Sequence, residues 1–363
     1  PGLASFSVRM GHHPSRSRKG ASMSTLAQLL PKAEIHVHLE GAIQPETLLR
    51  LATRHGIPLP ASDLEGVREF YRFKDFLHFI EVYTLICRCL RDPADFHLVT
   101  REFLRNQARQ NILYTEAFFA PGHFLKQGAD LGAIVSAIRQ AADEAEREDG
   151  VRFQLIADIS REMGAEFALE ITREVLRVRD RGILGLGIGG AEAEFPAEWF
   201  EESFALARSA GMPVVAHAGE AAGPESIWNA LRVLGASRIG HGFRAIEDAS
   251  LVAHLVAKQV PLEVCPTSNL RIGLVESYAQ HPMLRLLEAG CFITLNSDDP
   301  PMFNTDLVNE YEVARTVYGL SSTQLFELAC NAVRASFLPD ADKEALLGTF
   351  RTRFEAIPAD LRS

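Results

Sequence analysis

The stretch Lys32–Gly41, KAEIHVHLEG, combines a short strand pattern with two histidines one residue apart. In a β-strand, residues i and i+2 point to the same side, so His36 and His38 are expected to be neighbours on one face. The apolar residues between and beside them indicate a buried strand. Two ordinary core histidines would explain this stretch taken alone, so its meaning depends on the rest of the chain.

Similar short runs recur along the chain and alternate with longer amphipathic stretches, such as 130–148 and 196–211, the second ending at Gly211 as helices often do. Strands that are buried on both faces and joined by helices form parallel sheets. Eight such units in unbroken alternation predict the α/β fold of a closed (β/α)8 TIM barrel. The expected strands are 33–38, 112–119, 151–159, 183–189, 213–218, 238–242, 261–266 and 291–297.

No linker or low-complexity segment divides residues 25–363, so we expect a single domain there. The helical region between the first two strands, roughly 45–110, is too long for one crossover, and we expect this helical insertion to pack over the mouth of the barrel. Residues 1–24 are polar and basic without periodicity. A disordered extension, a transit-like segment or an extraneous start before Met23 all fit them.

The composition excludes several classes of protein. The 363 residues carry a formal net charge of -10 and are 47% hydrophobic, without a basic stripe, which argues against a nucleic-acid partner. No apolar run approaches the length of a membrane span. The five cysteines form no C-x-x-C pair, which favours reduced thiols in a cytoplasmic enzyme over disulfides or a zinc ribbon.

Polar residues gather at the ends of the expected strands, where barrel enzymes place their chemistry. Each has an ordinary explanation on its own, as a core histidine, a turn or a helix N-cap. Those explanations predict a scatter over the chain, whereas these residues recur at one end of successive strands, which favours a shared site. They are His36 and His38, Gly189 to Glu192, His217 and Glu220, His241, and Asp298 with Asp299.

Three imidazoles and a carboxylate make a suitable site for zinc or a similar divalent ion. We assign His36, His38, His217 and Asp298 as the metal ligands. Water bound to such a metal loses a proton near neutral pH, which favours hydrolysis at an electrophilic carbon. Glu220, His241 and Asp299 are then left for the chemistry.

Five motifs in this order resemble the adenosine deaminase family of metal-dependent amidohydrolases. They are HVHLEG, HAGE, RIGHG, EVCPTSN and LNSDDPPMF, and the similarity runs from about Leu30 to Leu338. The resemblance implies one zinc ion per subunit on the four ligands above. It also implies a small-molecule purine nucleoside as substrate and hydrolytic deamination at C6 of its adenine ring.

The family resemblance also implies individual roles. Glu220, His241 and Asp298 are the expected catalytic residues: Glu220 donates a proton to N1, while His241 orients the water and helps accept its proton. Gly190, Asp299 and Glu40 are the expected substrate-binding residues, with the Gly190 N–H facing N3 and Asp299 holding N7. Ammonia leaves only if the ring accepts charge, so the acid at N1 needs a pKa raised by burial.

Other classes fit the residues less well. The zinc deaminases that act on cytidine and on bases in nucleic acid use H-x-E with P-C-x-x-C, and neither pattern occurs here. A binding protein that kept only the barrel would be expected to lose a ligand or the acid, and none is lost. A metal hydrolase for amides or lactones could use a similar cage, but Glu220 and the second aspartate, Asp299, favour a purine ring.

The motifs point to three adenine compounds. Many adenosine deaminases have Asp where this chain has Glu40, and TEAFFAP (115–121) resembles adenine deaminases, which tend to carry SSE in place of GGAE (189–192). Longer stretches, among them 73–83, 223–231 and 297–311, resemble the aminodeoxyfutalosine deaminases of bacterial menaquinone synthesis. Those enzymes act on an adenine nucleoside with a 3-carboxyphenyl group. We therefore rank 6-amino-6-deoxyfutalosine first, adenosine second and adenine third.

Overall fold

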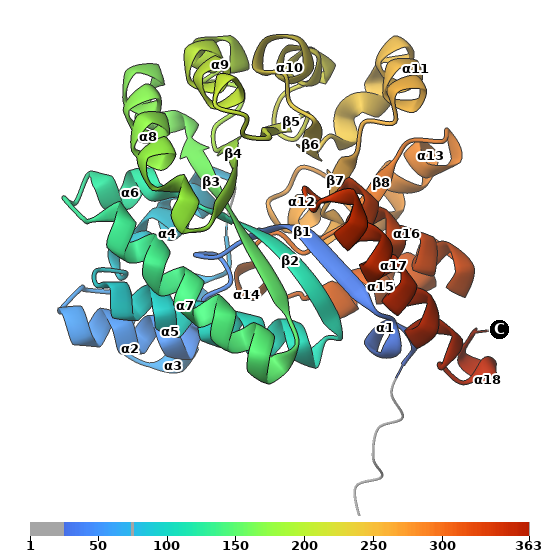
Figure 1. Ribbon diagram of the computed structural model, residues 1–363, viewed down its shortest axis with the longest axis horizontal. Coiled ribbons are helices and arrows are strands. Elements are labelled where there is room, and N and C mark those ends of the chain that lie inside the picture. The colour runs from blue at the N-terminus through green and yellow to red at the C-terminus, as the bar shows by residue number, and fades with distance from the viewer. Residues whose placement is uncertain (1–24, 74–75, 363) are drawn as a thin grey trace, which may run out of the picture.

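The computed structural model describes residues 25–73 and 76–362, so the expectation for residues 1–24 falls outside the described residues. Eight strands lie at its centre (Figure 1), and each begins and ends within two residues of its expected position. They are β1 (Lys32–His38), β2 (Ile112–Phe119), β3 (Arg152–Ser160), β4 (Ile183–Gly189), β5 (Val215–Ala218), β6 (Arg238–His241), β7 (Leu262–Val264) and β8 (Ile293–Leu295).

The strands close into a barrel. They pair in parallel in chain order within two halves, β1 to β4 and β5 to β8. Single bridges join the halves, Leu186 to Val214 on one side and Val37 to Asp298 on the other. At the second junction the His38 N–H donates to the Asp298 carbonyl at 2.9 Å. The predicted (β/α)8 barrel is therefore confirmed.

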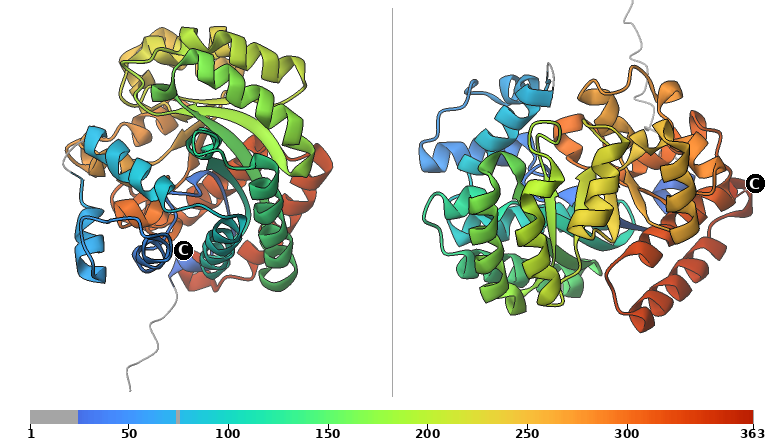
Figure 2. Two further views of the ribbon diagram at one scale, coloured as in Figure 1. Left: turned by 90° about the vertical axis from the view of Figure 1, so that its left-hand side faces the viewer. Right: turned by 90° about the horizontal axis from the view of Figure 1, so that it is seen from above.

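Helices enclose the strands on all sides, as the view from above shows (Figure 2). The stretch expected at 130–148 forms α7, and the stretch expected at 196–211 forms η3 and α9, followed by Gly211 at a φ of 74°. The α-helices are α1 (Leu26–Leu29), α2 (Pro45–His55), α3 (Leu64–Phe70), α4 (Phe76–Arg88), α5 (Pro93–Arg109), α6 (Pro121–Leu125), α7 (Leu131–Asp149), α8 (Ala165–Val178), α9 (Glu201–Ser209), α10 (Pro224–Asn229), α11 (Ala249–Lys258), α12 (Pro266–Arg271), α13 (Met283–Glu288), α14 (Pro300–Phe303), α15 (Leu307–Thr316), α16 (Ser322–Ala335), α17 (Asp340–Glu355) and α18 (Ala359–Arg362). Short 3₁₀ segments are η1 (Arg161–Met163), η2 (Arg179–Arg181), η3 (Ala197–Phe200), η5 (Phe243–Glu247) and η6 (Tyr278–Gln280), and η4 (Ala230–Leu234) is a π-helical turn.

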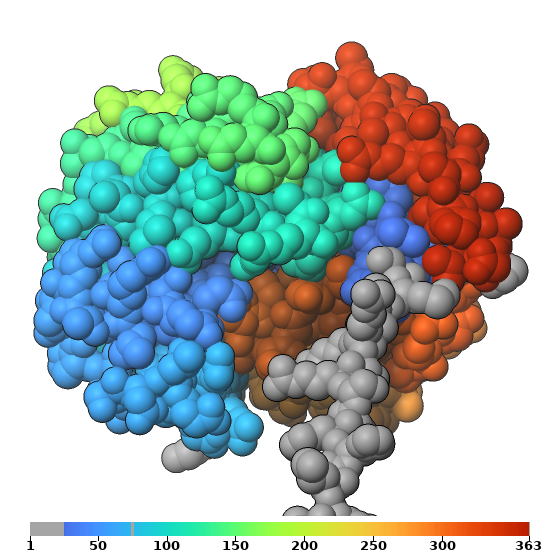
Figure 3. Space-filling model, turned by 90° about the horizontal axis from the view of Figure 1, so that it is seen from below, coloured from blue at the N-terminus to red at the C-terminus, as the bar shows by residue number. Residues whose placement is uncertain are grey.

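The long insertion after β1 does not all cover the barrel mouth, which corrects the expectation for 45–110. Among the described residues of this insertion, α4 and Arg91, in the loop after it, contribute side chains to the cavity there. Helix α5 lies on the barrel wall beside α7, where Arg101 pairs with Glu148 and Asp149. Helices α2 and α3 lie outside α5 and form one side of the molecule seen from below (Figure 3). Amphipathic periodicity does not tell which partner a helical face meets.

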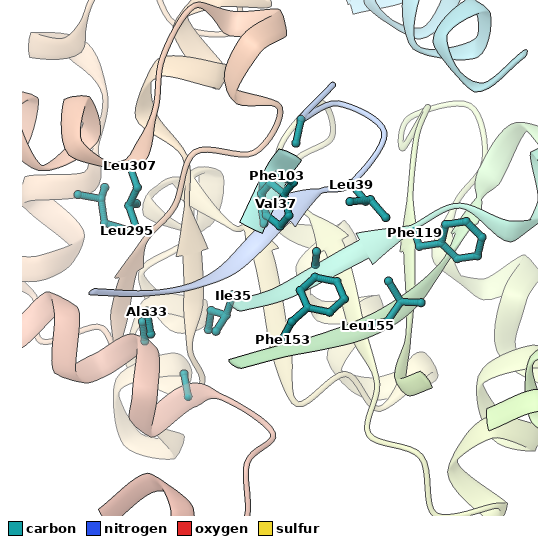
Figure 4. Packing of buried hydrophobic residues seen from close by; sticks show 14 of the residues in the cluster. Ala33, Ile35, Val37, Leu39, Phe103, Phe119, Phe153, Leu155, Leu295 and Leu307 are labelled. Carbon is teal, nitrogen blue, oxygen red and sulfur yellow. The ribbon is translucent and has the colours of Figure 1, made fainter. Parts of the chain in front are cut away.

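Side chains along β1 alternate between the apolar core outside the barrel and the barrel interior. Ile35, Val37 and Leu39 are buried in one apolar cluster with Phe103 of α5 and Phe119 of β2 (Figure 4). The residues between them, including His36 and His38, point to the other side of the strand. One strand therefore packs against the helices and also carries two imidazoles into the barrel. Among the described residues, no helix is long and apolar enough to cross a membrane.

Candidate active site

Four side chains predicted as metal ligands meet at the carboxyl ends of β1, β5 and β8. One ligand atom from each of His36, His38, His217 and Asp298 lies within 4.8 Å of the others. The His38 and His217 Nε2 atoms are 3.2 Å apart, and Asp298 Oδ1 lies 3.3 Å from His38 Nε2 and 3.5 Å from His36 Nε2. The His36 Nε2 atom is buried without a hydrogen-bond partner in the described chain. Nitrogen atoms facing each other at this spacing fit a shared divalent cation.

The backbone at this site is held in conformations that bring the ligands together. Asp298 has a φ of 64° and His241 a φ of 58°, in the left-handed region that non-glycine residues rarely adopt. A Cβ atom at Gly240 would lie 2.7 Å from His36 Cε1, so only glycine leaves room for the imidazole. The first glycine of the RIGHG motif, Gly240, thus leaves the space that His36 needs in the metal cluster.

Hydrogen bonds behind the ligands fix their orientation. His36 Nδ1 donates to Glu263 at 2.7 Å, and His217 Nδ1 donates to the Ile188 carbonyl at 2.9 Å. Each bond places the proton on Nδ1 and leaves the Nε2 lone pair for a cation. The Ser268 hydroxyl donates to Asp298 Oδ2 at 2.6 Å, which holds this carboxylate in place.

Glu220 lies beside the metal cluster as a buried acid. Its Oε1 atom is 3.4 Å from His241 Nε2, and burial next to the charges of Asp298 and Glu192 raises its pKa well above the usual value. Glu192 holds the loop after β5, because its carboxylate accepts from the N–H groups of Gly219 at 2.6 Å, Glu220 at 3.1 Å and Ala222 at 2.9 Å. Glu192 of the GGAE motif thereby positions Glu220, the acid of the HAGE motif.

A chain of hydrogen bonds sets the tautomer of His241. The Met283 N–H donates to His281 Nδ1 at 3.1 Å, and His281 Nε2 donates to Asn269 Oδ1 at 3.1 Å. The Asn269 amide then donates to His241 Nδ1 at 3.2 Å. Burial lowers the pKa of His241 to about 3, so the ring is neutral and carries its proton on Nε2, facing Glu220 and Asp298.

Asp299 and Gly190 lie on the wall of the same cavity. The Asp299 Oδ1 atom is buried without a hydrogen-bond partner in the described chain, and burial beside Asp298 raises the Asp299 pKa. A Cβ atom at Gly41 would lie 1.6 Å from that oxygen, so the glycine of HVHLEG makes room for Asp299. Gly190 has a φ of 98°, and a Cβ atom there would lie 2.4 Å from Glu162 Oε1, so only glycine fits beside that carboxylate.

Glu40 does not line the cavity, although it was expected to contact substrate. It is fully buried behind the wall, where its Oε1 accepts from the Ala120 N–H at 2.9 Å and its Oε2 from the Tyr83 hydroxyl at 3.2 Å. These bonds tie α4 to the ends of β1 and β2. Its contact with substrate stays a prediction, and the structure shows a positioning role.

The cavity extends well beyond the metal cluster. Its volume is about 520 Å³, within the usual range for small-molecule sites. One face of α4 forms a wall of Phe76, Phe79, Ile80 and Tyr83. The side chains of Arg88, Arg91 and Lys126 line its outer rim. A purine held at the metal cluster would fill only the inner part.

Several residues of the site escaped sequence reasoning. Glu263, Ser268 and Asn269 lie in quoted motifs, but the motifs do not show which residues they contact. Glu192 was expected at the site, but without a role. Asp158 also lines the cavity, at the carboxyl end of β3. A charged residue inside the apolar run 151–159 was the one signal that could have singled it out.

Comparisons with known proteins agree with this geometry. A family model described as adenosine deaminase matches residues 31–352. An aminodeoxyfutalosine deaminase of Streptomyces avermitilis is 40% identical over 338 residues, which span 93% of this chain and 94% of that protein. An adenine deaminase of Bordetella avium is 40% identical over 304 residues, spanning 84% of this chain and 96% of that protein.

A crystal structure of a zinc-bound amidohydrolase from Burkholderia ambifaria has the same fold. It is 25% identical and superimposes with a TM-score of 0.86, covering 95% of this chain and 97% of that one. The family match spans nearly all of the barrel, from the start of β1 into α17. The chain therefore belongs to the adenosine deaminase family, within the amidohydrolase superfamily.

Proposed function

We propose that this chain is a zinc-dependent hydrolase that removes the C6 amine of an adenine nucleoside, giving the hypoxanthine nucleoside and ammonia. The four ligand atoms fit one zinc ion per subunit, and the buried His36 Nε2 has no hydrogen-bond partner among residues 25–73 and 76–362. The zinc-bound structure from Burkholderia ambifaria supports this choice of metal. A divalent ion held here supplies water activation near neutral pH.

The chain's own residues supply the proton for N1 and orient the water, and the two protons that the water gives up restore Glu220 and leave with the ammonia. Glu220, protonated because of its raised pKa, donates to N1 as water adds to C6. His241 donates from Nε2 and orients the attacking water, since its hydrogen-bond chain leaves that nitrogen protonated. In this tautomer His241 holds the water and does not accept its proton, unlike the role expected from the sequence. The Asp299 carboxyl group on the cavity wall faces N7, and the Gly190 N–H faces N3. The ring is thus held on three edges while ammonia leaves.

We propose 6-amino-6-deoxyfutalosine as the substrate, which would place the enzyme in menaquinone synthesis. The observation that carries this choice is the cationic rim of the cavity, formed by Arg88, Arg91 and Lys126. None of the three forms an ion pair with a carboxylate in residues 25–73 and 76–362. Unpaired cations beyond an aromatic wall suit a substrate that ends in a carboxyphenyl group.

The positive charges of the rim also raise the electrostatic potential inside the cavity. His123 lines the same wall, and its pKa is lowered to about 4 by burial and then by the positive charges of Lys126 and Arg88. A substrate carboxylate placed there would meet a positive potential. The 40% identity to the Streptomyces avermitilis enzyme points the same way.

Free adenine is the second candidate. The Bordetella avium adenine deaminase is as similar in identity, over a somewhat shorter span of this chain. Adenine would occupy the ring site and leave the rim unused. Adenosine would also reach the ring site but brings no charge to the rim.

The test is deamination of 6-amino-6-deoxyfutalosine, adenosine, AMP and adenine by zinc-loaded protein, followed by ultraviolet absorbance. We expect the highest kcat/KM for the futalosine compound. Preference for adenine or adenosine would contradict the proposed substrate and leave the reaction standing. Preference for AMP would mean that the rim binds a phosphate. Turnover of none of them would contradict the deaminase proposal.

The five cysteines are free and buried, which supports a reducing compartment, and we propose the cytoplasm.

A further inference from the structure

Asp158 is a buried carboxyl group in the cavity that the proposed chemistry does not use. It lies in β3 with 5% of its surface exposed and lines the cavity wall. Its Oδ1 atom is buried without a hydrogen-bond partner, and neither of its oxygens forms a hydrogen bond or ion pair within the described chain. A buried carboxyl without a partner is costly, so its retention calls for a ligand or solvent in the cavity.

Glycines of the neighbouring strand make room for this carboxyl group. Asp158 pairs in register with Gly187 of β4. A Cβ atom at Gly187 would lie 2.5 Å from Asp158 Oδ1, and one at Gly189 would lie 3.0 Å from Asp158 Oδ2. The carboxyl group therefore lies against the β4 backbone, directly before Gly190.

Other carboxylates near Asp158 already have partners. Glu40 is bound to the Ala120 N–H and the Tyr83 hydroxyl. Glu162 is exposed, and its Oε1 accepts from the Ala191 N–H at 2.5 Å. Among the described residues, Asp158 is thus the buried acidic side chain on this side of the cavity that is left to meet a hydrogen-bond donor from the substrate.

The position beside Gly190 indicates which donor. In the proposed function, on which this step rests, the Gly190 N–H faces N3 of the purine. N3 and N9 are joined through C4, so the sugar on N9 lies at the same edge of the ring. In the anti conformer of the nucleoside, the 2′-hydroxyl, one carbon from the glycosidic bond, is the sugar hydroxyl nearest to N3.

We propose that Asp158 accepts a hydrogen bond from the 2′-hydroxyl of the substrate and thereby selects ribonucleosides over 2′-deoxynucleosides and free base. Asp158 is a substrate-binding residue in this view. It contributes to recognition of the sugar and leaves the ring chemistry to Glu220 and Asp299.

The experiment compares wild type, Asp158→Ala and Asp158→Asn on three substrates. These are the ribonucleoside that wild type turns over best, its 2′-deoxy analogue, and adenine. In wild type we expect kcat/KM to fall roughly 10- to 100-fold when the 2′-hydroxyl is removed, as when a buried hydrogen-bonding group is left without its partner. In Asp158→Ala the kcat/KM values for the ribonucleoside and its 2′-deoxy analogue should differ less than about threefold. Its rate on adenine should stay near that of wild type.

Asp158→Asn keeps the shape of the side chain and serves if the alanine variant fails to fold. Asp180→Asn, at a side chain that is 99% exposed, is the matched control. Equal losses of kcat/KM on all three substrates in the Asp158 variants would overturn the proposal. A wild type with the same kcat/KM for the ribonucleoside and its 2′-deoxy analogue would also overturn it. A wild type that prefers adenosine to the futalosine compound would contradict only the proposed substrate. A wild type that accepts adenine alone would overturn both.

Discussion

At the scale of single residues, Glu220 is distinguished by what surrounds it. Its neighbours are a neutral histidine and two carboxylates, so burial and like charge both favour the protonated acid. The HAGE motif alone gives the position of this acid and says nothing of its protonation. The structure supplies the reason: Glu192 holds the loop backbone and brings Glu220 into the cavity.

Glu220→Gln should lower kcat/KM by about 10²- to 10⁴-fold, because an amide cannot transfer a proton to N1. The raised pKa also sets the pH dependence: the acid is protonated below its folded-state pKa, so wild-type activity should fall as pH rises through that value. Rate measurements across pH check both effects. Glu225→Gln, exposed on α10, is the control, and near-normal turnover by Glu220→Gln would contradict the assignment.

Gly41→Ala tests the space that Asp299 needs. The new methyl group would lie 1.6 Å from Asp299 Oδ1, so the carboxyl group must move. A displacement of about 1 Å at a substrate contact costs on the order of 10²-fold in kcat/KM. Gly348→Ala on α17, where a Cβ meets nothing within 4 Å, should keep full activity. Unchanged rates in Gly41→Ala would show that Asp299 does not touch substrate.

At the scale of elements, the strands were predictable and the helical insertion was less so. Apolar runs such as 183–189 end at polar or glycine residues, and both features follow from burial in a parallel barrel. The metal ligands were predictable because strand ends meet at one rim. Glu263 was not, because its partner His36 comes from a strand distant in the sequence. Asp158 was not, because the space for its carboxyl group comes from the β4 glycines beside it.

Helix α4 carries the specificity of the outer cavity. Its aromatic residues and Arg88 recur at helical spacing on one face, and the bond between Tyr83 and Glu40 ties that face to the barrel. Apolar residues at this spacing are compatible with core packing and with a cover over the cavity. Both descriptions hold, since the same helix packs on Phe303 and lines the cavity.

Replacing Arg88 and Arg91 together by alanine should raise KM for the carboxylate substrate at least about fivefold, because two unpaired cations leave the rim. KM for adenine should not change, since adenine does not reach the rim. Steady-state kinetics on both substrates separate the two effects. Arg177→Ala, an exposed arginine on α8, is the control. An equal rise of KM for adenine would count against the rim as a carboxylate site.

At the scale of the whole molecule, the metal ligands join the two ends of the barrel. His36 and His38 come from β1, and Asp298 follows β8, at the junction where the Val37–Asp298 bridge closes the ring. A cation bound there links the first strand to the last. Metal binding should therefore stabilise the closed barrel as well as supply chemistry.

Removing the metal with a chelator should abolish activity and lower the midpoint of thermal unfolding by roughly 5–10 °C, as expected when a ligand bound far above its Kd is lost. Zinc should restore both, whereas magnesium should not, because imidazole donors favour zinc. His217→Ala already lacks one ligand, so the chelator should shift its midpoint much less. If wild type kept its midpoint and its rate after complete metal removal, measured by elemental analysis, the four residues would be a polar cluster of the core, and the attack on C6 would need another source of nucleophile.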